Sequence, residues 1–249
     1  MTRTVRSPAA EILSALATVM DPELDQPVTE LGFVRSVAID DDGVEVHLRL
    51  PTSFCAPNFA YLMVADAYDA LTGVPDAGRV RVLLDDHHDS DKINTGTAAA
   101  LGYVGTFGVE ARDSLDELRR TFQRKAHLAA MERCCRSVLV GGVWTIEELP
   151  LLELFDLPEG ALKSALMRRR EAIGLPTHSH ALVMVDHDGN PVAKSDVALW
   201  LRLAATTRVS IEGNAHFCRG LLATRYADTD PAGAASGFAP VITDSRSQS

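Results

Sequence analysis

Cysteine is the side chain in this sequence best suited to chemistry, and Cys55 has the most favourable setting. It stands two residues before Pro57, and proline is preferred at the first position of a helix. The partial positive charge and free N–H groups of a helix start stabilise a thiolate, and thiolates bind soft metals. The sequence therefore predicts a metal-binding or reactive sulfur at Cys55. The alternative is a small apolar side chain in the core.

A second candidate metal site is a polar run after the third expected strand. It contains Asp86, His87 and His88. Imidazole and carboxylate together suit iron or zinc. Polar runs of this kind are also common in solvated loops, and the residues alone leave both interpretations open.

Two other groups of residues combine cysteine with potential partners. Asn214 is expected to cap a helix whose first turn carries His216, with Cys218 close behind, and this second helix start also favours a thiolate. Cys134 and Cys135 are neighbours on an expected helix, so their side chains point about 100° apart and do not easily chelate one ion. The sequence therefore adds His216 and Cys218 as possible ligands and assigns Cys135 to core packing.

Hydrophobic periodicity predicts the elements that must position these side chains. The expected helices cover residues 8–20 and 57–73, and the expected strands cover residues 33–39, 44–50 and 80–84. Pro22 ends the first helix, and Asp42 with Gly43 marks a tight turn, so the first two strands should pair antiparallel. The order is helix, strand, strand, helix, strand.

The composition of the sequence changes after Lys92. A glycine-rich connection is followed by expected helices at residues 114–140, 158–173, 195–205 and 215–226. The rest, rich in Ala, Gly, Ser, Asp and Pro, is expected to be disordered. The sequence therefore predicts an α+β protein with a small domain at residues 1–92, a helix-rich domain at residues 93–226 and a tail at residues 227–249.

Residues 8–86 resemble a known family, whereas the C-terminal region resembles none that we recognise. The residues that carry the resemblance are Asp21, Pro22, Glu23, Leu31, Gly32, Val34, Thr52, Cys55 and Pro57. They are similar to the metal-sulfur cluster assembly domain of SufT-like and PaaD-like proteins, which has the same order of elements. The resemblance implies that Asp21 and Glu23 lie near Cys55 and supply oxygen donors or orient a partner. A helix stop with solvated carboxylates explains these two residues equally well, and Ala56 departs from the proline that usually follows the family's cysteine.

Charge and composition narrow the class of protein. The net charge is -10, and the first 92 residues hold 16 acidic and 7 basic residues. An acidic segment repels nucleic acid, and no apolar run approaches the roughly 20 residues that span a bilayer. Four cysteines, two of them adjacent, do not form a secreted disulfide pattern. We therefore expect a cytoplasmic protein with reduced thiols that binds neither nucleic acid nor membranes.

The resemblance implies an accessory factor for iron-sulfur or iron-centre assembly rather than an enzyme. In this hypothesis Cys55, with Asp21 and Glu23, transiently holds iron or an iron-sulfur cluster received from other assembly proteins. The helix-rich domain binds a client apo-metalloenzyme, such as a multicomponent monooxygenase. One alternative is a metal- or thiol-dependent hydrolase that uses Cys55 or the pair His87 and His88, although the sequence has no HExxH or GxSxG motif. Another is a protein-binding scaffold without a metal.

Overall fold

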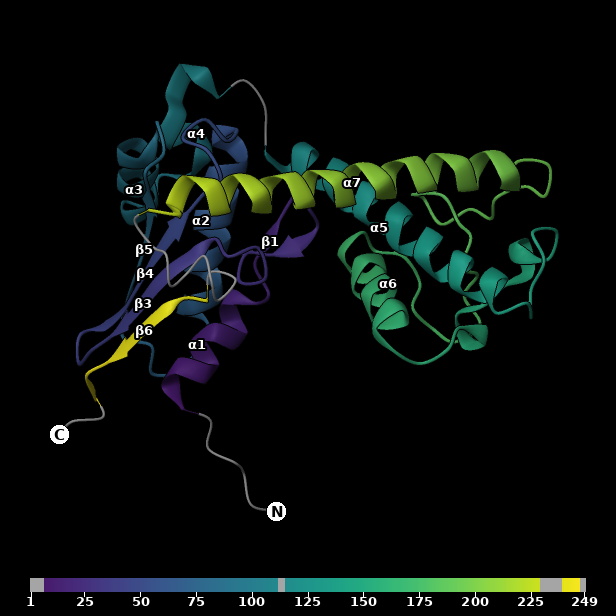
Figure 1. The fold of residues 1–249 in the computed structure, drawn as a ribbon, viewed down its shortest axis with the longest axis horizontal. Coiled ribbons are helices and arrows are strands. Elements are labelled where there is room, and N and C mark those ends of the chain that lie inside the picture. The colour runs from purple at the N-terminus through teal and green to yellow at the C-terminus, as the bar shows by residue number, and fades with distance from the viewer. Residues whose placement is uncertain (1–6, 112–114, 229–238, 247–249) are drawn as a thin grey trace, which may run out of the picture. The chain divides into compact units, whose positions relative to one another are not determined.

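The chain forms two compact units. The structure, a computed structural model, describes residues 7–111, 115–228 and 239–246 (Figure 1). Unit 1 comprises Met1–Leu115 and Asn214–Ser249, and unit 2 comprises Asp116–Gly213. Both helices and strands are present, which confirms the predicted α+β class. None of the described helices is long and apolar enough to cross a membrane.

Unit 1 is built on a four-stranded sheet with the order β5-β4-β3-β6. Its strands are β3 (Val34–Ile39), β4 (Gly43–Arg49), β5 (Arg79–Asp85) and β6 (Val241–Asp244). β3 and β4 pair antiparallel, as predicted, whereas β4 with β5 and β3 with β6 pair parallel. The carboxylate of Asp40 accepts hydrogen bonds from the N–H groups of Asp42 and Gly43 and closes the predicted turn.

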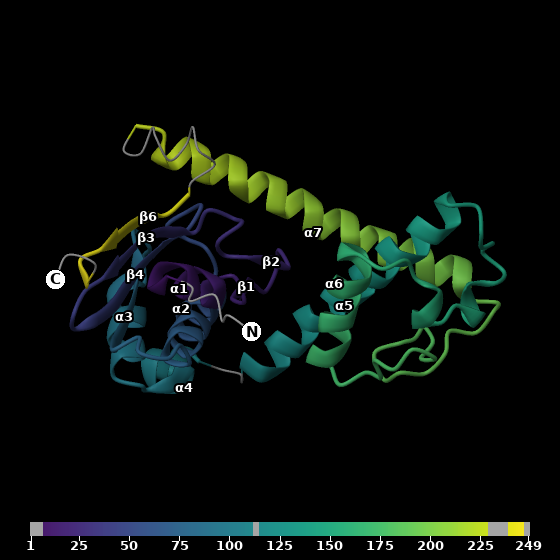
Figure 2. The ribbon, with the colours of Figure 1, turned by 90° about the horizontal axis from the view of Figure 1, so that it is seen from below.

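Helices and a small ribbon complete the N-terminal part of unit 1 (Figures 1 and 2). They are α1 (Pro8–Leu16), β1 (Met20–Asp21), β2 (Gln26–Pro27), α2 (Pro57–Thr72), α3 (Ser90–Ala98), α4 (Gly102–Phe107) and the 3₁₀ turn η1 (Gly108–Glu110). The buried faces of α1 and α2 share one apolar core with the sheet. α1 is shorter than predicted because Met20 and Asp21 pair with β2 instead of continuing the helix.

The core of unit 1 also contains residues that lie far along the chain. They are Ile93, Phe107, Ala215, Leu222 and Tyr226. The last three belong to α7 (Val197–Tyr226), which is one continuous helix where two, at residues 195–205 and 215–226, were predicted. The expected boundary at Lys92 therefore passes through a compact unit, because both the segment after it and the end of α7 cover apolar surface of the N-terminal domain.

The expected tail is only partly described. Residues 229–238 and 247–249 lie outside the described residues, so the prediction of disorder there is not addressed. Between them, β6 pairs with β3 from Ser36↔Val241 to Ile39↔Asp244. The tail prediction is therefore wrong for β6, whose backbone hydrogen bonds are satisfied by the edge of the sheet.

Unit 2 is mainly helical. It contains α5 (Leu115–Val140), the 3₁₀ turns η2 (Leu149–Leu151) and η3 (Leu154–Asp156), α6 (Ala161–Ala172) and the first part of α7. Its own apolar cluster includes Cys134 and Cys135 of α5, as predicted for Cys135. Burial raises the pKa of Cys134 to about 11, which keeps this thiol protonated. Arg208 joins α7 to α5 through an ion pair of 2.6 Å with Glu132.

Unit 2 contains a buried histidine whose ring nitrogens lack hydrogen-bond partners among the described residues. His127 on α5 is fully buried, and among the described residues neither ring nitrogen has a hydrogen-bond partner. Burial, together with the nearby charges of Arg170 and His187, lowers the pKa of His127 to about 3. The imidazole is therefore neutral in the folded protein across the physiological range.

This burial predicts that unit 2 loses stability in acid. The unfolded His127 takes up a proton below about pH 6.5 while the folded side chain stays neutral, so the free energy of unfolding should fall by up to about 1.4 kcal/mol per pH unit between pH 6.5 and 3. His127→Leu should remove most of this dependence, and His178→Leu, at an exposed site, should not. Urea unfolding at pH 7 and 5, followed by fluorescence, measures unit 2 because Trp144 and Trp200 both lie in it. Equal pH slopes in the wild type and His127→Leu would contradict this account.

Candidate functional site

Cys55 lies in the loop between β4 and α2, immediately before the N-cap residue Ala56. α2 begins at Pro57, as predicted, so the sulfur is beside a helix start. The sulfur atom is 3.5 Å from the hydroxyl oxygen of Thr52, and the Cys55 side chain is half-buried. The loop therefore presents this thiol in a fixed place without sealing it in the core.

His87 supports this loop from the end of β5. Its Nε2 lies 2.8 Å from the carbonyl oxygen of Cys55, and its Nδ1 accepts the N–H of Asp89 at 3.1 Å. Both ring nitrogens are engaged, so Nε2–H donates and Nδ1 has no free lone pair for a metal. His87 is buried, whereas His88 and Asp86 are exposed. These three residues do not form the metal site that the sequence suggested, because successive residues after a strand point in different directions.

Asp21 is a buried carboxylate at the end of β1. Its Oδ1 accepts hydrogen bonds from the N–H groups of Glu23 at 2.9 Å and Leu24 at 2.8 Å. Burial raises the pKa of Asp21 to about 6, although these two hydrogen bonds act in the opposite direction. Only 6% of Asp21 is exposed, so its carboxylate is not solvated. The alternative of a helix stop with a solvated carboxylate is therefore wrong for this residue.

The end of α7 brings Cys218 to the same place. Burial, together with the neighbouring groups Asp21, Cys55 and Glu23, raises the pKa of the Cys218 thiol to about 11. Asn214, one turn earlier, donates from Nδ2 to the carboxylate of Glu23 at 3.3 Å. Cys218 therefore lies within electrostatic range of Asp21, Glu23 and Cys55. That Asp21, Glu23 and Cys55 form one binding site stays a prediction.

The prediction that a helix start favours a thiolate at Cys218 is nevertheless wrong. Asn214 and His216 lie within the continuous helix α7, so Asn214 caps no helix and no free N–H groups surround Cys218. The pKa of Cys218 is raised, not lowered. His216 is exposed and two residues from Cys218, which places the two side chains about 200° apart around the helix. His216 and Cys218 therefore cannot bind one ion together.

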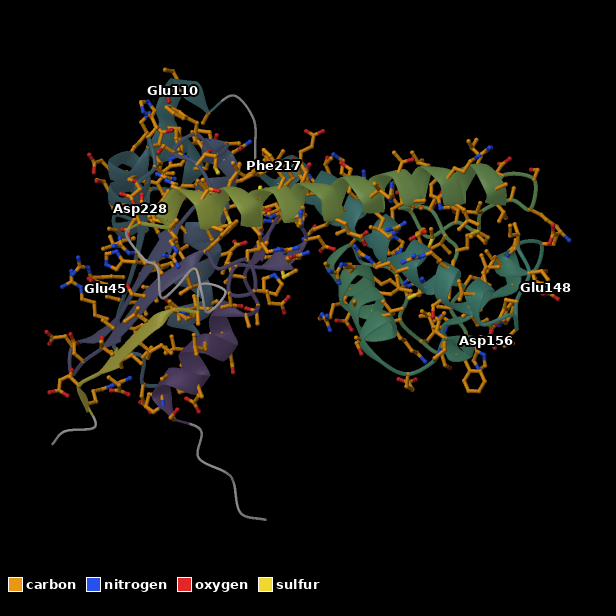
Figure 3. All side chains as sticks on the ribbon, in the orientation of Figure 1. Glu45, Glu110, Glu148, Asp156, Phe217 and Asp228 are labelled. Carbon is orange, nitrogen blue, oxygen red and sulfur yellow. The ribbon has the colours of Figure 1, made fainter. Side chains whose placement is uncertain are left out.

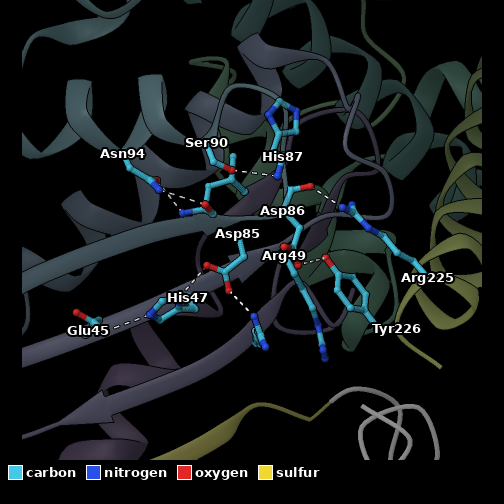
Figure 4. Close-up of polar contacts among 12 residues, drawn as sticks. Glu45, His47, Arg49, Asp85, Asp86, His87, Ser90, Asn94, Arg225 and Tyr226 are labelled. Carbon is cyan, nitrogen blue, oxygen red and sulfur yellow. Dashed lines mark hydrogen bonds and ion pairs between the residues drawn. The ribbon is translucent and has the colours of Figure 1, made fainter. Parts of the chain in front are cut away.

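Arg225 and Tyr226 fix the last turn of α7 over the ends of β4 and β5 (Figure 4). The Arg225 guanidinium donates to the carbonyl oxygen of Leu50 at 2.9 Å, to the hydroxyl of Ser53 at 2.7 Å and to the carbonyl of Asp86. The Tyr226 hydroxyl donates to the Asp86 carboxylate at 3.2 Å. Both loops that support Cys55 are therefore bonded to α7.

An exposed aromatic side chain stands next to each of the two cysteines. Phe54 is 80% exposed, and Phe217, which projects from α7 in Figure 3, is 65% exposed. Phe54 also contacts the ring of His88, with 5.9 Å between centroids. Large exposed aromatic rings are enriched where proteins dock. Among the described residues, no group of three or more His, Cys, Asp or Glu side chains is arranged to enclose a metal ion.

Comparison with known proteins finds similarity for the N-terminal segment. Residues 9–84 match the sequence model of the iron-sulfur cluster assembly protein family. Residues 9–84 are thus similar to iron-sulfur cluster assembly proteins, and we call them the assembly domain because of this similarity. It contains β1, the Cys55 loop and the three strands β3, β4 and β5, and it agrees with the resemblance seen at residues 8–86. The match ends at residue 84, so α7 and its Cys218 lie outside the assembly domain.

Curated relatives share this domain with the chain. An iron-sulfur cluster carrier protein of Mycobacterium leprae is 34% identical over 96 residues, which cover 37% of this chain and 24% of that protein. A carrier protein of the same name from Mycobacterium tuberculosis is 37% identical over 84 residues, 33% of this chain and 22% of that protein. An uncharacterized protein of Methanocaldococcus jannaschii is 29% identical over 85 residues, 34% of this chain and 87% of that protein. The chain thus spans about a quarter of the carrier proteins, and no solved structure gives a significant match.

Sequence reasoning missed Arg225, Tyr226 and the two exposed aromatic residues. A signal for Arg225 and Tyr226 was available, since Ala215, Leu222 and Tyr226 recur at helical spacing and require an apolar partner surface. Which surface they cover could not be read from that spacing. The sequence around Phe54 and Phe217 has no local pattern that distinguishes a docking residue from a core residue.

The environment of Asp21 predicts a stabilising substitution. Because the folded pKa of about 6 exceeds the unfolded value, the stabilisation due to the protonated form is complete below about pH 4 and is lost as the pH rises through 6. Asp21→Asn should keep the acceptor for the N–H groups of Glu23 and Leu24 and should stabilise unit 1 by about 1–3 kcal/mol at pH 7.5. The gain should vanish at pH 4. Urea unfolding followed by near-ultraviolet ellipticity of the tyrosines, all four of which lie in unit 1, measures it.

The matched control is Asp41→Asn in the exposed turn between β3 and β4. It removes the same charge without changing a buried group, so its effect on the free energy of unfolding should be small at both pH values. The account would be contradicted if Asp21→Asn stabilised unit 1 equally at pH 7.5 and pH 4, or destabilised it at pH 7.5. Either result would show that burial does not disfavour the charged form of Asp21.

Proposed function

We propose that this protein accepts iron or an iron-sulfur cluster as cargo on its assembly domain and passes it to a client apo-metalloenzyme. The observation that carries the proposal is the setting of Cys55 inside a domain of the iron-sulfur cluster assembly family. The thiol is half-buried, beside the start of α2, and its loop is held by Thr52 and His87. A sulfur in a fixed place that solvent still reaches can both bind and release a soft metal.

The carboxylates near the thiol support a cationic cargo. Burying Asp21 as an anion beside Glu23 is costly unless a positive charge is also present. Groups with strongly shifted pKa values that converge at one place are typical of functional sites. The names of the mycobacterial relatives, iron-sulfur cluster carrier proteins, support the same cargo.

A client-binding role for unit 2 is the second part of the proposal. Unit 2 lies outside the segment that matches the family, and it has a core of its own. Leu151 and Phe155, on the adjoining turns η2 and η3, are 71% and 69% exposed, which suits a docking surface. The client class that we propose, a multicomponent monooxygenase, rests on the PaaD-like resemblance. Other cluster-assembly proteins would supply the cargo in the cytoplasm.

The central test is anaerobic reconstitution of the protein with iron and sulfide, read by visible absorbance. Cys55→Ala should abolish the absorbance of a bound cluster and the activation of the client, because no other sulfur of the assembly domain replaces it. Circular dichroism should remain that of the wild type, since a half-buried cysteine contributes little packing. Cys134→Ala, which alters a buried thiol of unit 2, should keep both the absorbance and the client activity.

The alternatives give different results in this test. A metal-free scaffold would activate its client equally well with Cys55→Ala. A hydrolase would turn over model esters or amides with added zinc and lose this activity in Cys55→Ala or His87→Ala. Either result would reject the carrier function.

A further inference from the structure

The end of α7 presents a buried face to the assembly domain. Ala215, Cys218 and Leu222 follow one another at intervals of three and four residues, so they lie on one side of the helix. Ala215 and Leu222 are fully buried in the core of unit 1, and Cys218 is half-buried between them. The Cys218 thiol therefore points to the assembly domain, whereas its neighbour Phe217 points to solvent.

Hydrogen bonds on both sides of Cys218 hold α7 in this register. On one side, Asn214 donates to Glu23 and Arg219 donates to the side chain of Gln26. On the other side, Arg225 donates to Leu50 and Ser53, in the loop that leads to Cys55. Cys218 is thus placed between the segment that carries the two carboxylates and the loop that carries the first thiol.

The groups near this part of α7 are acidic or can become anions. Asp21 and Glu23 are carboxylates, and Cys55 and Cys218 become anions when they lose their protons. Negative charges placed close together repel one another, so each one makes the next less favourable. A bound cation reverses this effect, because a thiol that coordinates a metal is deprotonated outright.

We propose that Cys218 is a second sulfur ligand, so that the cargo is held between the thiolates of Cys55 and Cys218. The inference rests on the proposed function and deepens it, since it states which residues of this chain hold the iron or cluster. Cys55 is the one cysteine in residues 9–84, so a second sulfur has to come from outside the assembly domain, and α7 supplies it. Binding of a divalent metal releases one proton from each thiol.

Two protein sulfurs suit a carrier better than a storage site. Iron and zinc in sulfur sites take four ligands when the site is closed. Two thiolates leave coordination positions that a client's own cysteines can occupy during transfer. The exposed rings of Phe54 and Phe217, one beside each sulfur, provide apolar surface for that client at the same place.

The test uses the full-length reduced protein with cobalt(II) under anaerobic conditions. Cobalt bound to thiolate gives a charge-transfer absorption whose intensity follows the number of sulfur ligands, so Cys218→Ala and Cys218→Ser should each lower it to about half of the wild-type value. Cys134→Ala should keep the full intensity. Without metal, a bifunctional bimane reagent, which fluoresces when it joins two thiols, should cross-link Cys55 to Cys218 within one chain. This product should be absent from Cys55→Ala and from both Cys218 variants.

The outcomes separate the two proposals. If both Cys218 variants keep the wild-type cobalt spectrum while Cys55→Ala loses it, the second-ligand inference is wrong and the carrier function stands. The inference is equally wrong if the wild type shows no cross-link between Cys55 and Cys218. If the wild type binds neither cobalt through sulfur nor a reconstituted cluster, both proposals fail. The serine variant keeps the size of the side chain, so a loss shared by serine and alanine is due to the sulfur.

Discussion

The guanidinium of Arg225 connects the three parts of the chain on which the site depends. It belongs to α7, and its hydrogen bonds reach the loop after β4 at Leu50 and Ser53 and the loop after β5 at Asp86. Hydrogen bonds from a charged donor are about twice as strong as neutral ones. Since the first loop carries Cys55 and the second carries His87, one side chain determines how α7, and with it Cys218, meets both. Tyr226 reinforces this contact, because its ring also lies 5.1 Å from the guanidinium of Arg49.

The site collects groups that repel one another when they are charged. Asp21, Glu23, Cys55 and Cys218 come from three separate segments of the chain. Hydrogen bonds from the N–H groups of Glu23 and Leu24 offset part of the cost for Asp21, but its pKa remains raised. Strongly shifted pKa values of this kind are typical of functional sites.

The N-terminal domain was predictable because its signals are local. The alternation in β3 and β4, the Asp-Gly turn and Pro57 at the start of α2 each act within a few residues, and the structure confirms them. The position of Cys55 just before the start of α2 was predictable for the same reason. α7 was divided wrongly because Asn214 is typical of a helix start, whereas the structure continues one helix from Val197 to Tyr226. Cys218 lies more than 160 residues after Cys55 in the sequence, and its packing against the core of unit 1 depends on which surface α7 covers. That information is not local.

β6 has a practical consequence for work with this protein. It occupies the open edge of β3, where unpaired backbone N–H and C=O groups would otherwise recruit a strand from a second molecule. Shortening the chain before Val241, or attaching a tag that pulls this strand away, would uncover that edge and promote association between molecules. An N-terminal tag leaves the β3–β6 pairing untouched.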